Sequence, residues 1–245
     1  MNLTDLSRIY LINILEIITK NGYGVEIGGP SGNCEIIYKN SKNMDNIVFS
    51  SNTVWENNGT GEYNFYQDKK GKTIVNDATN ISSVESETYD FCFSSHCLEH
   101  IANPLKAVSE WLRIVKNDGY VIMILPEKKH CFDHDRDNSV FSTLLSQYLR
   151  NVGEDDLSSL PEILKKHDLS MDTAAGNFEQ FTRRSLENFD NRCLHHYVYT
   201  PELLKSICEY FKCEFIHTYT EGLNIWFVMK KTKECSLSIK DEMFN

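Results

Sequence analysis

The stretch that most constrains the fold of this 245-residue chain is Val25-Glu26-Ile27-Gly28-Gly29-Pro30-Ser31-Gly32. It is a short apolar run that includes one acidic residue, followed by a turn with three glycines in five positions. Glycine has no Cβ and reaches positive φ without strain, so the backbone N–H groups of such a turn can approach a ligand closely. A tight strand-to-helix turn that binds nothing has the same composition. The stretch therefore predicts a strand and a glycine turn, with or without a ligand.

The glycine spacing excludes two common nucleotide sites. No Gly-x-x-x-x-Gly-Lys-Ser/Thr pattern occurs, so no phosphate-binding lysine follows the turn. Gly28, Gly29 and Gly32 also miss the offsets of the dinucleotide pattern Gly-x-Gly-x-x-Gly, and Pro30 intervenes. The remaining pattern, Glu-x-Gly-x-x-x-Gly, resembles the first motif of class I S-adenosylmethionine (SAM)-dependent methyltransferases. Pro30 stands where that motif usually has its middle glycine.

Strands and helices are expected to alternate along most of the chain. Strands are predicted at 25–27, 46–50, 73–75, 89–94, 121–125, 215–219 and 225–229. Helices are predicted at 3–17, just after Gly32, from Pro104 to the Asn117-Asp118-Gly119 turn, and from Pro201. This alternation indicates an α/β fold with a Rossmann-like, doubly wound and mostly parallel sheet, which the resemblance extends to seven strands.

Residues 127–196 interrupt the alternation. They are polar and rich in His and Asp, with helices predicted around 139–150, 157–168 and 179–189. We expect residues 1–126 and 197–231 to form a SAM-binding domain and 127–196 to form a helical insertion that caps the substrate. Residues 232–245 are expected to be a tail.

The net charge and the cysteines limit which binding partners and which cellular compartment are expected for this chain. The net charge is −10, and no Lys/Arg run is longer than a pair, which argues against nucleic acid as a partner. The eight cysteines include no Cys-x-x-Cys pair and are expected to be reduced, as in a cytoplasmic protein. The longest strongly apolar run, Tyr120 to Leu125, is too short to span a bilayer.

The predicted strand ends supply candidates for cofactor binding, because ligands of open parallel sheets bind at the carboxyl ends of the strands. Asp77 follows the third strand and could accept the exocyclic amine of adenine, with the Ala78 N–H donating to the ring. A turn cap is the alternative role for Asp77. The second strand ends at Ser50-Ser51-Asn52, with Glu56 the nearest carboxylate, so the usual acidic contact to ribose has no clear candidate.

A longer resemblance covers residues 89–120, which contain His96-Cys97-Leu98-Glu99-His100 and Asn103-Pro104. This segment resembles a methyltransferase sub-group found among bacterial surface-polysaccharide (capsule) biosynthesis genes. Further matching features are Glu26-Ile-Gly-Gly-Pro-Ser31, Phe49-Ser50, Thr53-x-Trp55, and Phe132-Asp133 with Arg136. The match is close over about 23–137 and loose over 195–230.

The resemblance implies which residues would bind each part of SAM. The segment from Glu26 to Gly32, including Gly28, Gly29, Pro30 and Ser31, would hold the methionine and ribose parts of SAM. Asp77 and Ala78 would bind the adenine, and Ser95 and His96 would lie on the sulfonium side.

The same residues also allow a different interpretation. His96-x-x-Glu99-His100 matches the inverted zinc-peptidase signature, which needs both histidines on one face of a continuous helix. A new helix is expected to begin only at Asn103-Pro104, and no third ligand is indicated. A metal held by His130, His134 and Asp135 has no supporting spacing either, so no metal is predicted.

Histidine is the natural base near neutral pH, and six of the eight histidines fall in three clusters. We expect His196 or His134 to act as the base, with Asp133 orienting it. Arg136 is expected to bind an anionic group of the substrate, and His130 and His195 to contribute to substrate binding.

The sequence thus predicts a SAM-dependent methyltransferase that modifies an oxygen of a small sugar, nucleotide-sugar or phosphorylated precursor and releases S-adenosylhomocysteine. A homodimer is an open possibility. The alternatives are a catalytically silent SAM-fold binding or scaffold protein, suggested by the missing acid after the second strand, and the zinc hydrolase.

Overall fold

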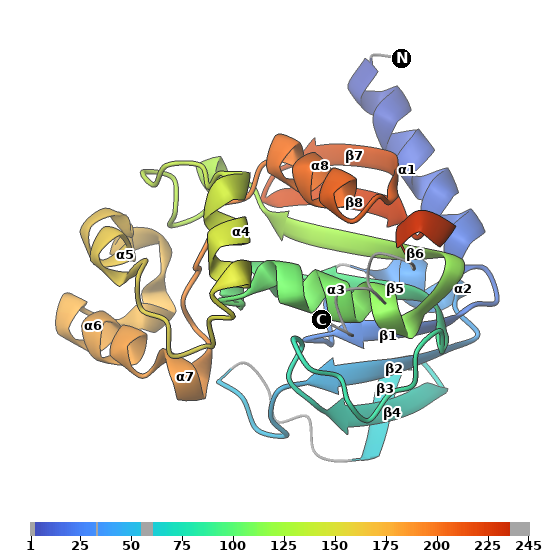
Figure 1. Cartoon of the computed structure of the whole chain (residues 1–245), viewed down its shortest axis with the longest axis horizontal. Helices are drawn as coiled ribbons and strands as arrows, with labels where there is room; N and C mark the ends of the chain where they lie inside the picture. The colour runs from blue at the N-terminus through green and yellow to red at the C-terminus, as the bar shows by residue number, and fades with distance from the viewer. Residues whose placement is uncertain (1–2, 33, 55–60, 236–245) are drawn as a thin grey trace.

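The computed structural model describes residues 3–32, 34–54 and 61–235, and its centre is one mixed β-sheet (Figure 1). The strands of this sheet are β1 Tyr23–Ile27, β2 Asn43–Val48, β3 Gly61–Tyr66, β4 Lys69–Val75, β5 Tyr89–Ser95, β6 Val115–Pro126, β7 Glu214–Glu221 and β8 Asn224–Lys230. Their spatial order is β3-β4-β2-β1-β5-β6-β8-β7. Pairing is parallel from β4 through β6 and antiparallel at both edges. The Rossmann-like, mostly parallel sheet is therefore confirmed.

Between β1 and β5 the order of the strands reverses. From β1 to one edge of the sheet the strands lie in the order β2, β4 and β3. The chain then returns to place β5 on the other side of β1. The register aligns Ile27 at the end of β1 with Ile47 on β2 and Ser94 on β5. A crevice for ligands is expected at the carboxyl ends of such strands.

The sheet has eight strands rather than the seven expected. The extra strand, β3, pairs with β4 as an antiparallel hairpin. Its burial alternates, because Tyr63 and Phe65 point into the core while Glu62 and Asn64 are exposed. This alternation is typical of an edge strand with one covered face.

The start of β6 also differs from the expectation. Helix α3 (Pro104–Ile114) ends before the predicted Asn117-Asp118-Gly119 turn, and these three residues lie inside β6. The register between β5 and β6 shifts there, and Asp118 has a φ of 63°. The Asn117-Asp118-Gly119 segment therefore forms an irregularity within a strand and does not end a helix.

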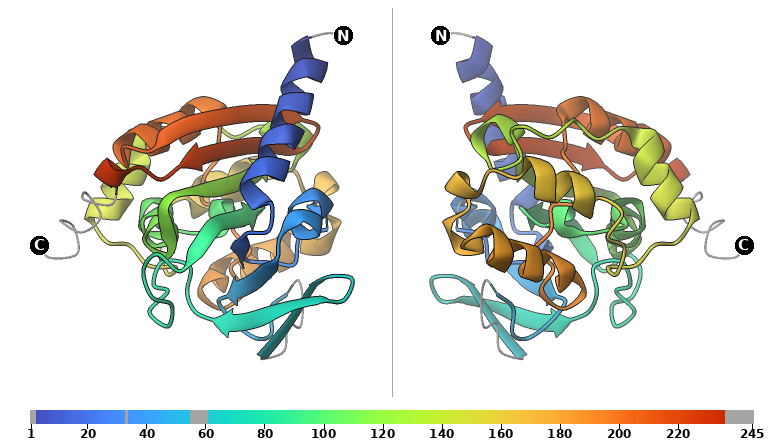
Figure 2. Two further views of the ribbon diagram at one scale, coloured as in Figure 1. Left: turned by 90° about the vertical axis from the view of Figure 1, so that its right-hand side faces the viewer. Right: turned by 90° about the vertical axis from the view of Figure 1, so that its left-hand side faces the viewer.

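Helices cover both faces of the sheet (Figure 2). On one face, α1 (Leu3–Thr19) and α2 (Glu35–Asn40) pack in a core cluster with Phe91, Phe93 and Ile122. On the other face, α3, α4 (Phe141–Leu149) and α8 (Pro201–Tyr210) bury a larger cluster around Trp111. The predicted caps are confirmed, because the Asn103 and Thr200 side chains accept from backbone N–H groups in the first turns of α3 and α8.

The segment 127–196 forms a group of short helices beside the carboxyl ends of the strands (Figure 1). Besides α4, it contains η2 Lys128–His130, α5 Leu160–Lys166, η3 Leu169–Met171, η4 Thr173–Ala175, α6 Phe178–Leu186 and α7 Asn188–Asn191. A small apolar cluster of its own includes Leu160, Ile163 and Phe181.

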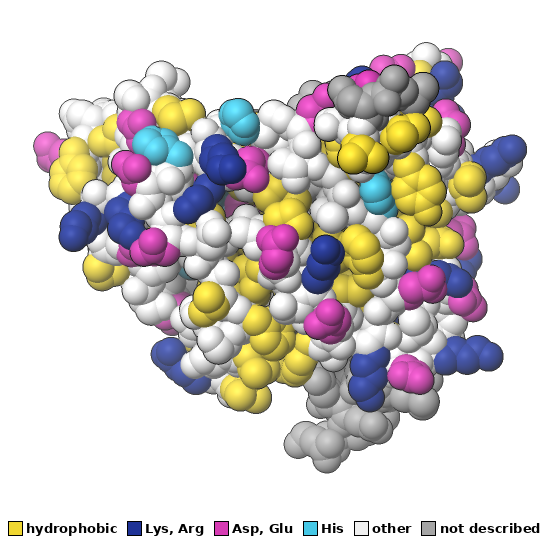
Figure 3. Space-filling model, turned by 90° about the horizontal axis from the view of Figure 1, so that it is seen from above, with side chains coloured by type: hydrophobic (Ala, Val, Ile, Leu, Met, Phe, Trp, Pro, Cys, Tyr) yellow, Lys and Arg dark blue, Asp and Glu magenta, His cyan; other side chains and the backbone are white. Residues whose placement is uncertain are grey.

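The surface seen in Figure 3 carries acidic and basic side chains interspersed, without a continuous field of one sign among the coloured atoms. Among the helices of the described residues, none has both the length and the hydropathy needed to cross a bilayer.

Candidate cofactor and active site

A cavity of about 380 Å³ opens at the carboxyl ends of the parallel strands. It is lined mainly by the ends of β1, β2, β4 and β5 and by two residues of the segment 127–196. The lining residues are Ile27, Gly28, Gly29, Pro30, Ser31, Gly32, Ile47, Val48, Phe49, Thr53, Asn76, Asp77, Ala78, Ser95, His96, Cys97, His100, Ile101, Glu154 and Arg192. All the cofactor-binding candidates except Glu26 thus face one space.

The turn after β1 requires glycine at two positions. Gly28 has a φ of 77°, a conformation that other residues rarely adopt. A Cβ on Gly29 would lie 2.1 Å from the carboxyl carbon of Glu26. The turn is held to β2 by Asn46, whose side chain accepts from the Gly29 N–H at 3.0 Å and donates to the Gly29 carbonyl at 2.8 Å.

Glu26 lies beneath the turn rather than in the cavity. Its carboxylate is fully buried and accepts hydrogen bonds from the Ser31 hydroxyl at 2.6 Å, from the Tyr38 hydroxyl at 3.0 Å and from Tyr63. Burial raises the pKa of Glu26, although these donors act in the opposite direction. Glu26 therefore fixes the shape of the turn and contacts a bound ligand only through it.

Asp77 caps the turn with one oxygen and contacts Arg192 with the other. Its Oδ1 atom accepts from the Thr79 N–H at 2.8 Å and from the Thr79 hydroxyl at 2.7 Å, which is the turn cap. Its Oδ2 atom lies 3.4 Å from Nη2 of Arg192. The carboxylate is thus oriented by the turn and offers its second oxygen on the cavity side.

Arg192 is a cavity residue that the sequence reasoning missed. It follows α7 with a left-handed backbone, and its guanidinium lies 5.2 Å from the centre of the Phe49 ring. Its Nη1 atom is 3.3 Å from Oε1 of Glu154, which is also in the cavity wall. No local motif marks Arg192 or Glu154, because both enter the site through the packing of the segment 127–196.

The end of β2 lines the cavity with Phe49 and Thr53. Glu56, the nearest carboxylate in sequence, and Trp55 lie outside the described residues. Among the described residues, the cavity wall next to β2 therefore contains no acidic side chain.

The zinc-peptidase interpretation of His96 and His100 is wrong. The helical turn η1 contains only Leu98–His100, and His96 precedes it with a φ of 48°. The Nε2 atom of His96 lies 2.8 Å from Oδ1 of Asn224 on β8. The two histidines are therefore not presented one turn apart on a continuous helix.

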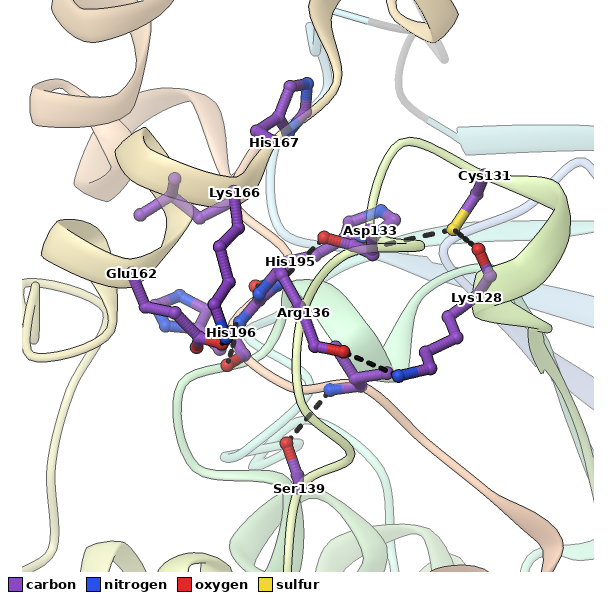
Figure 4. A network of polar contacts seen from close by, with 12 residues as sticks. Lys128, Cys131, Asp133, Arg136, Ser139, Glu162, Lys166, His167, His195 and His196 are labelled. Carbon is purple, nitrogen blue, oxygen red and sulfur yellow. Dashed lines mark hydrogen bonds and ion pairs between the residues drawn. The ribbon is translucent and has the colours of Figure 1, made fainter.

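A second polar group lies around the loop after β6 (Figure 4), and the centre of its His195 ring lies 4.5 Å from the centre of the His100 ring. The Nδ1–H of His195 donates to Oδ2 of Asp133 at 2.5 Å, and Nη1 of Arg136 donates to the other oxygen at 2.9 Å. Burial would raise the pKa of Asp133, but His195 and Arg136 lower it to about 2. Burial would lower the pKa of His195, but the Asp133 carboxylate raises it.

The guanidinium of Arg136 makes its hydrogen bonds to other residues of this polar group. Its side chain is 2% exposed, and its guanidinium donates to the carbonyl oxygens of His195 at 2.7 Å and His196 at 3.2 Å. It ties the loop after β6 to the chain before α8. An anionic substrate group could reach it only if these contacts opened.

The remaining histidine candidates lie apart from each other. His196 is buried, its Nε2 atom is 3.2 Å from Nδ2 of Asn188, and burial lowers its pKa to about 4. His134 lies on the surface side of the loop, with its Nε2 atom 2.9 Å from Asp168. His130 is exposed at the end of η2. The structure therefore pairs Asp133 with His195, not with His196 or His134 as expected.

Comparison with known proteins assigns the fold and the domain. Residues 47–123 match a family model described as a methyltransferase domain. Similar solved structures include a SAM-dependent methyltransferase from Methanosarcina mazei, with 14% identity, a TM-score of 0.51, and coverage of 95% of this chain and 99% of that chain. Residues 47–123 thus match a methyltransferase domain, and the chain has the fold of SAM-dependent methyltransferases.

Two further structures agree with this assignment. A SAM-dependent methyltransferase from Mesorhizobium loti matches at 7% identity and a TM-score of 0.52, covering 89% of this chain and 96% of that chain. A protein from Pyrococcus horikoshii OT3 matches at 13% identity and a TM-score of 0.51, covering 94% of this chain and 92% of that chain. No curated protein matches the chain significantly. At such identities the structures establish the methyltransferase fold and leave the acceptor open.

The cavity of this methyltransferase domain fits SAM. The glycine turn leaves backbone exposed at one end, where a Cβ on Gly32 would meet no described atom within 4 Å. Asp77 and the Ala78 backbone lie at the β4 end, as adenine recognition requires. SAM supplies the electrophilic methyl group, and the protein aligns the acceptor with it.

Proposed function

We propose that this protein transfers a methyl group from SAM to an oxygen of a small sugar, nucleotide-sugar or phosphorylated precursor of a surface polysaccharide. The observation that carries the proposal is the single cavity whose wall contains Gly28–Gly32, Asp77-Ala78 and Ser95-His96. These three segments follow β1, β4 and β5, of which β1 and β5 border the reversal of strand order. One adenosyl sulfonium molecule would contact all of them.

The proposed orientation of SAM follows from the chemistry of these segments. Phe49 and Asp77 would hold the adenine, and the glycine turn would hold the methionine part. Ser95, His96 and His100 would then lie on the methyl side of the cavity, whose wall also includes Glu154 of the segment 127–196. An acceptor entering beside that segment would meet the methyl group there.

The reaction is an in-line displacement. A lone pair of the acceptor oxygen forms the C–O bond while the C–S bond breaks, and the electron pair of that bond stays on sulfur as S-adenosylhomocysteine forms. The hydroxyl proton passes to a base or to water. Alignment of the two reactants contributes about 7–11 kcal/mol to such a step, and a positioned base about 10²–10⁴-fold in rate.

Support for a sugar or phosphorylated acceptor is of two kinds. The resemblance of residues 89–120 to methyltransferases of polysaccharide biosynthesis suggests the substrate class. The cavity wall also includes His96, His100 and Glu154, which offer hydrogen-bonding groups for hydroxyls. These groups suit an acceptor with several hydroxyls better than an apolar one.

Two measurements test the proposal. Calorimetry with SAM and with S-adenosylhomocysteine measures cofactor binding, and incubation with methyl-labelled SAM and a panel of nucleotide-sugars and sugar-phosphates measures transfer. We expect Asp77→Asn to weaken SAM binding by about 10–100-fold, because hydrogen bonds to charged groups contribute about 1.5–3 kcal/mol. Asp68→Asn is the matched control, since Asp68 is exposed in the turn between β3 and β4.

The outcomes separate the alternatives. Binding of SAM with transfer of label to a member of the panel supports the proposal. Binding without transfer to any precursor would favour a catalytically silent binding protein. Equal SAM affinity in the native protein and Asp77→Asn would contradict the proposed placement of adenine.

A further inference from the structure

Two buried side chains and one half-buried side chain beside the cofactor cavity form a cluster of potential metal ligands. They are Glu99 and His100, at the end of η1, and His195, on the chain before α8. One nitrogen of each histidine and one oxygen of Glu99 all lie within 4.8 Å of one another. Within the described residues, no other group of three His, Cys, Asp or Glu side chains comes together in this way.

Glu99 is the first indication of a missing partner. Its side chain is 0% exposed, and neither of its carboxylate oxygens has a hydrogen-bond partner. Its nearest ion-pair partner is Nδ1 of His96, 3.6 Å away. A buried carboxylate without donors is costly, and buried charges are normally paired or bound to a metal.

The two histidines are oriented as metal ligands are. The Nδ1–H of His195 donates to the Asp133 carboxylate at 2.5 Å, and the Nδ1–H of His100 donates to the carbonyl of Leu194 at 3.2 Å. Metal-binding histidines almost always donate their second N–H to a carboxylate or a carbonyl in this way. In both rings this places the proton on Nδ1, so Nε2 is the nitrogen that would coordinate.

We propose that Glu99, His100 and His195 bind one divalent transition-metal ion. Two histidines and one glutamate are a known ligand set of catalytic zinc sites, which keep a further coordination position open. Distances of about 2.0–2.2 Å from the ion would bring the three ligand atoms closer together than the 4.8 Å limit. Small side-chain rotations of Glu99 and of the two rings supply that movement.

The position of the site gives the ion a role. His100 also lines the cofactor cavity, next to the proposed position of the methyl group. If the proposed function holds, the open coordination position binds the acceptor oxygen, and the ion lowers the pKa of that hydroxyl as it does for bound water. The hydroxyl proton is released to water, and the oxygen then attacks the methyl group as described above.

The test is a metal titration without SAM or acceptor, so its failure is distinct from failure of the proposed function. Chelator-stripped full-length protein is titrated with Co²⁺ while visible absorption is followed, and Zn²⁺ is then added as a competitor. We expect one Co²⁺ per chain, visible ligand-field bands, and their loss when Zn²⁺ displaces the Co²⁺.

Substitutions of the proposed ligands test where the Co²⁺ ion binds. Glu99→Gln and His195→Gln are expected to weaken Co²⁺ binding by more than about 100-fold, and Asp133→Asn by about 10–100-fold, since it only orients His195. His217→Gln is the control, because His217 lies on β7 and contacts Ser7 of α1. We also expect the metal-free Glu99→Gln protein to melt no lower than the native protein, because the change removes an unpaired buried carboxylate.

Three results would overturn the proposal. One is the absence of stoichiometric Co²⁺ binding by folded native protein. Another is native-like binding by Glu99→Gln or His195→Gln. The third is a loss in His217→Gln equal to that in His195→Gln, which would indicate binding elsewhere on the chain.

Discussion

The guanidinium of Arg192 lies 3.4 Å from the carboxylate of Asp77, in the position where the proposed adenine amine must approach. The same guanidinium lies over the Phe49 ring and contacts Glu154. The arginine thus occupies part of the proposed adenine site. With adenine placed there, cofactor binding would displace the arginine from Asp77 and leave Glu154 as its partner.

This relationship predicts that Arg192→Met binds SAM more tightly than the native protein. An ion pair contributes about 0–1 kcal/mol and a cation–π contact about 0.5–1 kcal/mol even where water screens them, so removing both favours SAM by about 2–30-fold. Calorimetry measures the dissociation constant. Arg183→Met, an exposed arginine on α6, is the control. Weaker binding by Arg192→Met would mean that the arginine contacts the cofactor instead of competing with it.

The glycine turn supplies a second prediction. In Gly29→Ala the new Cβ would overlap the Glu26 carboxyl group, 2.1 Å from its carbon. The overpacked turn should lower the free energy of unfolding by about 1–3 kcal/mol and abolish SAM binding at micromolar concentrations. Gly32→Ala should change stability by less than about 0.5 kcal/mol, because its Cβ meets no described atom within 4 Å. Urea unfolding and calorimetry measure both effects, and equal stability of the two variants would contradict the described turn.

The hairpin strand β3 supplies a third prediction through Tyr63. Its hydroxyl donates to the buried Glu26 carboxyl group, so Tyr63→Phe removes one hydrogen bond from a buried acceptor. The free energy of unfolding should fall by about 1–3 kcal/mol. Tyr66→Phe should have less effect, since the Tyr66 hydroxyl contacts Glu35 at 3.3 Å on the surface. Urea unfolding of the two variants measures the difference in their free energies of unfolding. Identical unfolding curves would argue against a structural role for β3.

The sequence predicted the sheet and most of the residues that line the cavity at its edge, because both depend on local patterns. The apolar runs at β1, β5 and β6 identify buried strands, and the glycine turn and Asp77 follow strand ends directly. Parallel strands then bring these ends to one edge of the sheet. Strand β3 was missed because the Asn/Gly-rich residues before it dominate the pattern, although the alternation of Tyr63 and Phe65 was a usable signal.

The remaining features depend on contacts between distant segments. Arg192 reaches Asp77 across 115 positions of chain only because α7 packs near the end of β4. Likewise, Asp133 meets His195 rather than a nearer histidine because Arg136 binds both the Asp133 carboxylate and the carbonyls of His195 and His196. No spacing rule encodes such pairs. The catalytic residues therefore stay predictions, while the fold is established.

The last prediction concerns the pH dependence of stability and rests on Glu26. Burial raises its pKa in the folded protein, so over the range between the unfolded value and that raised value the folded state keeps a proton that the unfolded state has lost. The stability contributed by this group therefore falls as pH rises above about 4.5. In Glu26→Gln the side chain no longer titrates, so the native protein should lose stability relative to this variant between pH 4 and pH 7. Urea unfolding at each pH measures the difference, with Glu35→Gln, an exposed glutamate on α2, as the control. A difference between native and Glu26→Gln that stays constant over this range would contradict a raised pKa for Glu26.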